Sequence, residues 1–266
     1  MADKKISQLT ELTSANAATD FLPVVDTSAV ETKKITLANL PLSDAAKDSA
    51  YPYTTDFQSG TEQTRNLTSI TSGAYYFNTN LTSIYVGSNV TSIGSSAFGY
   101  CTALTSITIG NNVTTLGSYS FSSCTTLPSI NIPDSVTSIG LSAFASCNIL
   151  ASVTIGNGVT SIGAAAFQSC TSLTSVTIGN SVTSIGTNAF SYSTALTSII
   201  IPDSVTSIGN SAFVNCTGLA TINCLATTAP TIGSNAFNGV AATDIHVPVG
   251  AAYPATYGGL TVVFDL

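Results

Sequence analysis

The sequence of 266 residues has almost no charge beyond its first quarter. All six Lys and Arg residues lie at or before Arg65, and nine of the thirteen acidic residues lie there too. From Asn66 to Leu266 there are four Asp residues and no Lys, Arg or Glu. A surface without cations neutralises no phosphates and attracts no anionic lipids. Nucleic acid and membrane surfaces are therefore excluded as partners of this part of the chain.

Long apolar runs are also missing. No stretch approaches the roughly 20 residues of a membrane span. The first residues, "MADKKISQLTEL", lack the apolar run of a secretory signal. We therefore expect synthesis and folding in a reducing cytosol.

The sequence contains few residues that could bind a metal or carry out covalent catalysis. The single histidine, His246, stands beside Asp244, which is too little to indicate a Ser–His–Asp arrangement. Asp134 and Asp203 are three sequence units apart, roughly 14 Å at strand spacing, which is too far for paired carboxylates. No C-x-x-C pair is present, so zinc is not indicated. The sequence predicts no enzyme, no metal and no cofactor.

What the sequence does contain is a 23-residue repeat. Phe recurs at this step, and Leu and Gly columns keep the same step; the Phe column is Phe98, Phe121, Phe144, Phe167, Phe190 and Phe213, with Phe237 one residue late. In each unit "LTSITI" has strand periodicity, "GNN" or "PDS" is a turn, and "VTSIG" is a second short strand. "SSAFGYC" is too short for a helix and reads as a turn. One unit cannot bury its apolar edge alone, so the pattern predicts a mostly β solenoid of about seven coils.

The cysteines follow the same period. Cys101, Cys124, Cys147 and Cys170 share one column, Ser193 takes the next place and Cys216 resumes it, while Cys224 lies in a core strand position. A disulfide or metal ladder is one interpretation. The other, which in-register parallel side chains favour, is small, buried, reduced thiols that tolerate Ser once.

Two columns of small uncharged residues point away from the core on the "LTSITI" strand. They are our candidate ligand contacts: Ser83, Ser106, Ser129, Ser152 and Ser175 in the first, and Tyr85, Thr108, Asn131, Thr154 and Thr177 in the second. Tyr100, Tyr119 and Tyr192 are added as aromatic anchors. Such a surface suits a neutral glycan or a protein matched by shape and hydrogen bonds. Ser and Thr are also simply soluble strand residues, and regular hydroxyl columns occur in ice-binding solenoids, so both alternatives stay open.

These units resemble the leucine-rich repeat of the BspA-like, or Treponema-type, class. "IPDSVTSIGLSAF" and "IPDSVTSIGNSAF" carry the resemblance, which covers about residues 67–242. It implies a leucine-rich-repeat solenoid with a binding or adhesive role and no catalytic activity. We place the solenoid at residues 66–242 and a C-terminal cap at 243–266, and Asn66–Asn80 reads as a degenerate first coil.

The N-terminal segment has a different pattern. "KISQLTEL", "DFLPVVD" and "ETKKITLANL" resemble the attachment segment of tailed-phage appendage proteins. The resemblance implies that residues 1–45 dock onto other virion proteins, that residues 46–65 form a linker, and that the solenoid projects toward a host receptor or glycan. The predicted function is a phage tail fibre or head decoration, with localisation in the virion. The alternative is a cellular surface adhesin or protein-interaction module at the cell surface; a homo-oligomer is compatible with either.

Overall fold

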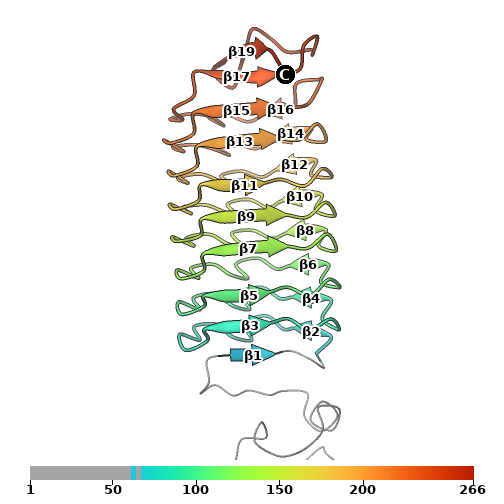
Figure 1. The fold of residues 1–266 in the computed structure, drawn as a ribbon, viewed down its shortest axis with the longest axis vertical. Coiled ribbons are helices and arrows are strands. Elements are labelled where there is room, and N and C mark those ends of the chain that lie inside the picture. The colour runs from blue at the N-terminus through green and yellow to red at the C-terminus, as the bar shows by residue number, and fades with distance from the viewer. Residues whose placement is uncertain (1–60, 64–66) are drawn as a thin grey trace, which may run out of the picture. The chain divides into compact units, whose positions relative to one another are not determined.

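The computed structural model describes residues 61–63 and 67–266, and every described strand belongs to a stack of coils (Figure 1). The predicted anchor at 1–45 and most of the predicted linker lie outside the described residues. Strand β1 (Thr61–Gln63) falls inside the predicted linker and pairs in parallel with β3 (Ser83–Tyr85), so the end of that segment already belongs to the stack. The described residues contain no helix.

Each coil contributes one long and one short strand. The short strands form a single parallel sheet in the order β16-β14-β12-β10-β8-β6-β4-β2. Their bounds are β2 (Ser69–Ile70), β4 (Ser92–Ile93), β6 (Thr115–Leu116), β8 (Ser138–Ile139), β10 (Ser161–Ile162), β12 (Ser184–Ile185), β14 (Ser207–Ile208) and β16 (Thr231–Ile232). The predicted solenoid is confirmed, with eight coils instead of seven, because the degenerate Asn66–Asn80 stretch forms a complete one with Tyr75 in the Phe position.

The long strands lie on the opposite side, in three ladders of order β1-β3-β5, β7-β9-β11 and β13-β15-β17-β19-β18. Their bounds are β5 (Ser106–Thr108), β7 (Ser129–Ile132), β9 (Ser152–Ile155), β11 (Ser175–Thr177), β13 (Ser198–Ile201), β15 (Thr221–Cys224), β17 (Asp244–Val247), β18 (Thr256–Tyr257) and β19 (Leu260–Phe264). All pairs are parallel except β18 with β19. Strands β17 and β19 continue the ladder into the residues predicted to be a cap.

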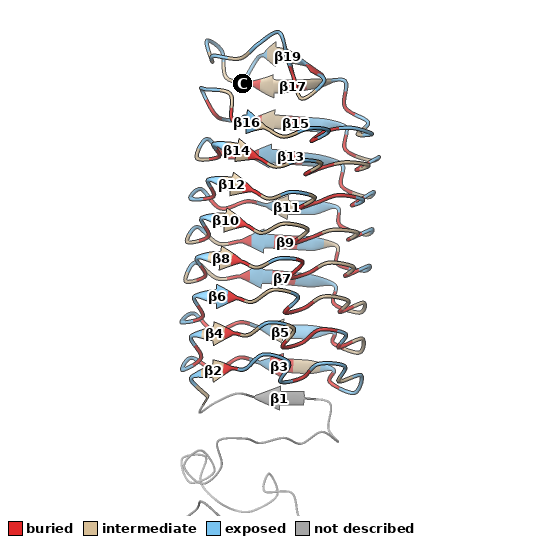
Figure 2. Cartoon of the chain, turned by 180° about the vertical axis from the view of Figure 1, so that it is seen from behind, coloured by how far each residue is buried: buried red, intermediate tan, exposed pale blue. Residues whose placement is uncertain are grey.

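The core runs through the stack between these two sheets (Figure 2). The long strands β7, β9 and β13 alternate exposed and buried residues, as period-2 patterning predicts. The Phe column is fully buried, and successive rings stack nearly parallel with centroids 5.0 to 5.4 Å apart. The repeated Gly after "VTSI" permits this spacing: a Cβ on Gly140 would lie 2.6 Å from the carbonyl carbon of Gly117.

A third wall is made of turns, as the short "SSAFGYC" segment predicts. Its backbone N–H groups alternate between two kinds of partner. Ala97 donates within its own turn to Gly94, whereas Phe98 donates to the carbonyl of Ser120 in the next coil at 2.7 Å. This alternation satisfies the backbone of a wall that has no regular secondary structure.

Candidate binding surface

The long strands present the predicted hydroxyl columns in register. Ser83 pairs with Ser106, and Tyr85 with Thr108. The same alignment joins the remaining predicted residues of each column, namely Ser129, Ser152 and Ser175 in one and Asn131, Thr154 and Thr177 in the other. All are exposed except Ser83, which is half-buried. We call these two columns the strand face.

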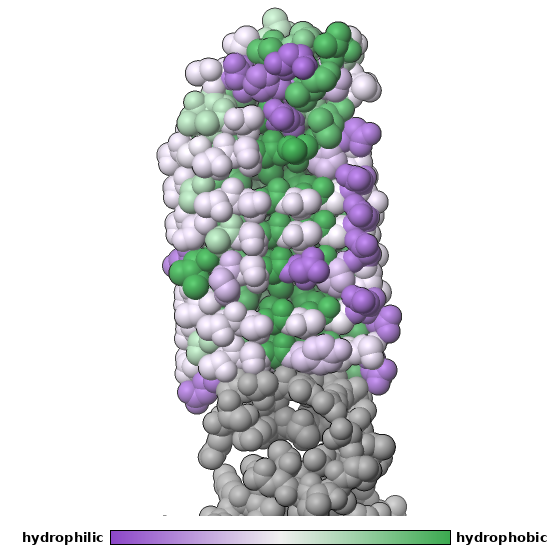
Figure 3. Space-filling model, viewed as in Figure 1, coloured by the Kyte–Doolittle hydropathy of each residue, from purple (hydrophilic) through white to green (hydrophobic). Residues whose placement is uncertain are grey.

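A shallow groove of about 590 Å³ runs along one edge of the strand face. One wall is Asn131, Thr154 and Thr177 of the second column. The other wall is the turn that follows each long strand, including Asp134, Asn157 and Asn180. Figure 3 shows pale polar columns separated by an apolar stripe, with strongly hydrophilic side chains along this edge.

The turn wall is held by side-chain hydrogen bonds between coils. Asn157 N–H donates to Asp134 Oδ1, and Asn180 N–H donates to Asn157 Oδ1 at 2.6 and 3.0 Å. The Asp134 carboxylate therefore accepts a hydrogen bond from the backbone of the next coil. The groove offers amide, hydroxyl and carbonyl groups and a single carboxylate, with no cation among its lining residues. It therefore suits an uncharged, hydrogen-bonding partner.

The strand face extends further than the sequence indicated. Asn223 pairs with His246, and Asp244 and His246 occupy the positions of the Ser and Thr columns on β17. Assigning residues 243–266 to a separate cap hid this continuation, because the cap interrupts the 23-residue step. The visible signal was the alternation in "DIHV", which matches that of "SIII".

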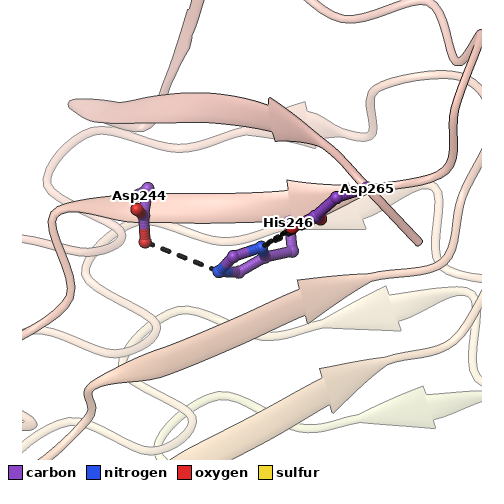
Figure 4. Close-up of polar contacts among 3 residues, drawn as sticks. All are labelled: Asp244, His246 and Asp265. Carbon is purple, nitrogen blue, oxygen red and sulfur yellow. Dashed lines mark hydrogen bonds and ion pairs between the residues drawn. The ribbon is translucent and has the colours of Figure 1, made fainter.

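His246 lies between two carboxylates (Figure 4). Its Nδ1 is 2.9 Å from both carboxylate oxygens of Asp265, and its Nε2 is 3.6 Å from Asp244 Oδ1. The contact joins the last residues of the chain to β17. We call His246 with its two carboxylate partners the polar clamp. Searched over the described range, no set of three metal-ligating side chains is arranged to hold an ion.

The three predicted tyrosine anchors lie elsewhere. Tyr100, Tyr119 and Tyr192 are exposed, but they sit on the turn wall with left-handed backbone, φ 59 to 60°. The structure thus separates them from the hydroxyl columns, and of the predicted aromatic residues only Tyr85 lies on the strand face. Sequence reasoning missed Tyr76 and Phe77, which are exposed beside Tyr100. Their signal was the aromatic run "YYF" at residues 75–77.

The six cysteines are free and buried, as predicted. Burial raises the pKa of Cys101, Cys147 and Cys216 from 9.0 to about 12, so their thiolates are suppressed. The column is more than apolar filling, however. Cys147 Sγ donates to the carbonyl of Phe121 at 3.2 Å, and Ser193 Oγ makes the equivalent bond to Phe167 at 3.1 Å.

Comparison with known proteins agrees with this architecture. The model of the BspA type leucine rich repeat region matches six copies over residues 47–160 and 147–253. A leucine-rich repeat protein from Bacteroides ovatus is 32% identical with a TM-score of 0.61, over 68% of this chain and 47% of that chain. A leucine rich cell surface protein from Faecalibacterium prausnitzii is 33% identical with a TM-score of 0.57, over 68% of this chain and 59% of that chain.

The leucine rich repeat protein of T. pallidum is 25% identical with a TM-score of 0.50, over 65% of this chain and 70% of that chain. The chain spans roughly half the length of the first two relatives. A search of curated protein sequences found no match. Within the described ranges, no helix has the length and apolar character to cross a bilayer. The repeat matches cover more than half of the sequence, and the chain belongs to the BspA-type leucine-rich repeat family.

Proposed function

We propose that the coil stack is a non-enzymatic adhesive or protein-interaction module, and that the strand face with its groove contacts the partner. The observation that carries this proposal is the in-register set of uncharged hydrogen-bonding side chains on β7, β9 and β11, which lies beside a groove. The family is one of repeat modules, and one relative is described as a cell surface protein. The cell surface is therefore the first location at which to look for this protein.

A binding experiment can test the strand face directly. Thr154 lines the groove, and Thr187, which follows the short strand β12, is likewise exposed. Labelled full-length protein is titrated onto cultured bacterial cells, and binding is measured by flow cytometry. We expect Thr154→Glu to weaken binding at least tenfold, because a desolvated charge opposes a neutral contact. The Thr187→Glu control should bind like the parent protein, and equal binding by both variants would contradict the assignment.

A phage virion appendage is the second candidate. It is favoured by one observation, the N-terminal resemblance of residues 1–45 to virion attachment segments, which lies outside the described residues. Peptide mass spectrometry on purified virus particles and on cell-surface fractions distinguishes the two. Recovery at fixed stoichiometry with a capsid protein supports the appendage, with residues 1–45 contacting other virion proteins. Recovery only from cell surfaces supports the adhesin.

A further inference from the structure

Each coil turns through two residues with left-handed backbone. The first position is occupied along the stack by Gly73, Ser96, Tyr119, Ser142, Ala165, Asn188, Ser211 and Asn235. The second is occupied by Phe77, Tyr100, Ser123, Ser146, Ser169, Tyr192, Asn215 and Gly239. This conformation favours Gly and Asn and disfavours bulky residues. Aromatic residues at these positions are therefore not required by the turn.

Two of these aromatic residues form a cluster with a third. Phe77 and Tyr100 stack with ring centroids 4.5 Å apart and planes 11° apart. The Tyr76 ring stands edge-on to both, at 4.6 and 5.8 Å. The exposed fractions of Tyr76, Phe77 and Tyr100 are 47%, 55% and 40%, so the rings contact one another without being buried. We call these three residues the aromatic corner.

The neighbouring coil is shaped to accept the Tyr76 ring. Gly99 occupies the position that later coils fill with Ser122, Ala145 or Gln168. A Cβ at Gly99 would lie 3.0 Å from Cδ2 of Tyr76, so a larger residue there would require the ring to shift by a few tenths of an ångström. Gly99 does not have left-handed backbone, so the turn does not require glycine at this position. What glycine provides here is space for the Tyr76 ring. The packing of Tyr76 in the aromatic corner therefore depends on the absence of a side chain at Gly99.

The sequence around the aromatic corner contains no charged residues, which indicates an uncharged partner. Residues 66–133 include no Asp, Glu, Lys or Arg. Neighbouring polar groups are amides and hydroxyls. Asn78, for example, is half-buried next to Phe77 in the sequence and accepts from the N–H groups of Asn80 and Leu81 through Oδ1. Among the described side chains of these coils, residues 67–133, neither an anion nor a cation would find a counter-charge, and the contacting rings leave no space for an ammonium cage.

We infer that the aromatic corner is a binding site for neutral sugars, separate from the strand face. A pyranose ring has an apolar, weakly positive C–H face that stacks on the negative face of an aromatic ring. Its hydroxyls pair with amide and hydroxyl groups of the kind that Asn78 provides. The strained backbone at Phe77 and Tyr100 is consistent with residues retained for contact.

The test uses the full-length protein and defined probes. Cellohexaose, laminarihexaose, chitohexaose and mannohexaose serve as neutral ligands, and hexagalacturonate serves as the anionic one. Binding is measured by calorimetry and by tyrosine emission, which is unobscured because the chain has no Trp. We expect at least one neutral hexasaccharide to bind and hexagalacturonate not to bind. Failure of all four neutral probes would overturn the inference.

Variants then locate the site. The double variant Phe77→Asn and Tyr100→Asn should lose at least tenfold in affinity while its melting temperature is unchanged or higher, because Asn suits the left-handed backbone. Gly99→Ala should weaken binding by displacing Tyr76. Ile149→Asn, which removes a similarly exposed apolar side chain on a distant coil, is the control. Unchanged affinity in the double variant, or light scattering that shows the aromatic corner joining two copies of the chain, would refute the sugar site.

Discussion

At the residue scale, the buried columns are selected for hydrogen bonding as well as for size. The carbonyls of Tyr75, Phe98, Phe121, Phe144 and Phe190 each accept from a cysteine 26 residues later. At Ser193 in the same column, the hydroxyl donates the equivalent hydrogen bond to the carbonyl of Phe167. A thiol is a weak donor that costs little to bury. Substitution by Ser at this position is thereby explained.

Ser120 shows the opposite case. It occupies a column whose other buried members are Ala97, Ala143, Ala166, Ala189, Ala212 and Ala236, and its buried Oγ has no hydrogen-bond partner among the described residues. An unsatisfied buried hydroxyl costs about 1–3 kcal/mol. We expect Ser120→Ala to raise the free energy of unfolding by about 1 kcal/mol in urea titrations. Ser193→Ala should lower it, because that variant leaves the Phe167 carbonyl unpaired; equal effects of the two variants would contradict this account.

The buried thiols give the fold a defined alkaline limit. Burial raises the pKa of Cys101, Cys147 and Cys216 from 9.0 to about 12. Below pH 9 these thiols are protonated in both the folded and the unfolded state. Between pH 9 and 12 the unfolded chain releases protons that the folded chain retains, so the free energy of unfolding falls as pH rises.

Unfolding midpoints in urea measured from pH 7 to pH 11 check this expectation. The midpoint should be constant to about pH 8.5 and then decline. Native protein should resist a thiol reagent at pH 8, and all six thiols should react after denaturation. Rapid labelling of the folded protein would show that the cysteine column is open to solvent.

At the element scale, the stacked Phe rings connect each coil to its neighbours. Phe144 contacts Phe121 and Phe167 at centroid distances of 5.0 and 5.3 Å and is fully buried. Phe144→Ala should cost about 3–5 kcal/mol through loss of burial and a residual cavity. Because coupling is between neighbouring coils, the variant should unfold in two transitions by calorimetry. Phe237→Ala, with a single ring neighbour in the column, is the control and should keep one transition.

The elements that the sequence predicted are those with a repeating physical cause. Alternation in "LTSITI" and the Gly that closes "VTSIG" predicted both strands, because burial and close coil spacing repeat at each step. The left-handed turn positions were not predicted, because Ser, Ala and Tyr occupy them without a glycine signal. The tyrosine anchors were consequently assigned together with the strand face, although the turn wall carries Tyr100, Tyr119 and Tyr192. The aromatic corner depends on contacts between coils, and these follow only from three-dimensional stacking.

At the scale of the whole molecule, the contacts of the chain divide it into residues 1–54 and 55–266. The second unit includes β1 and every described strand. We expect a truncated protein of residues 55–266 to fold alone, with the β-rich circular dichroism and the melting temperature of the full chain. A truncation at residue 66, which removes β1 and exposes the edge of β3, should be less stable. If the protein of residues 55–266 failed to fold, residues 1–54 would be shown to support the stack.

One polar clamp joins the last residues of the chain to β17 at the C-terminal end of the stack. His246 Nδ1 meets Asp265 at 2.9 Å, whereas its Nε2 is 3.6 Å from Asp244. Exposed polar contacts of this kind contribute little to global stability, but an end coil has a neighbour on one side only. Opening free energies are lowest at such ends. His246→Ala should therefore accelerate amide hydrogen exchange in β17–β19 and leave the strands β7 to β11 unchanged. Asp244→Asn, which alters the longer contact, should have the smaller effect, and faster exchange along the entire stack would show that the cap is coupled to every coil.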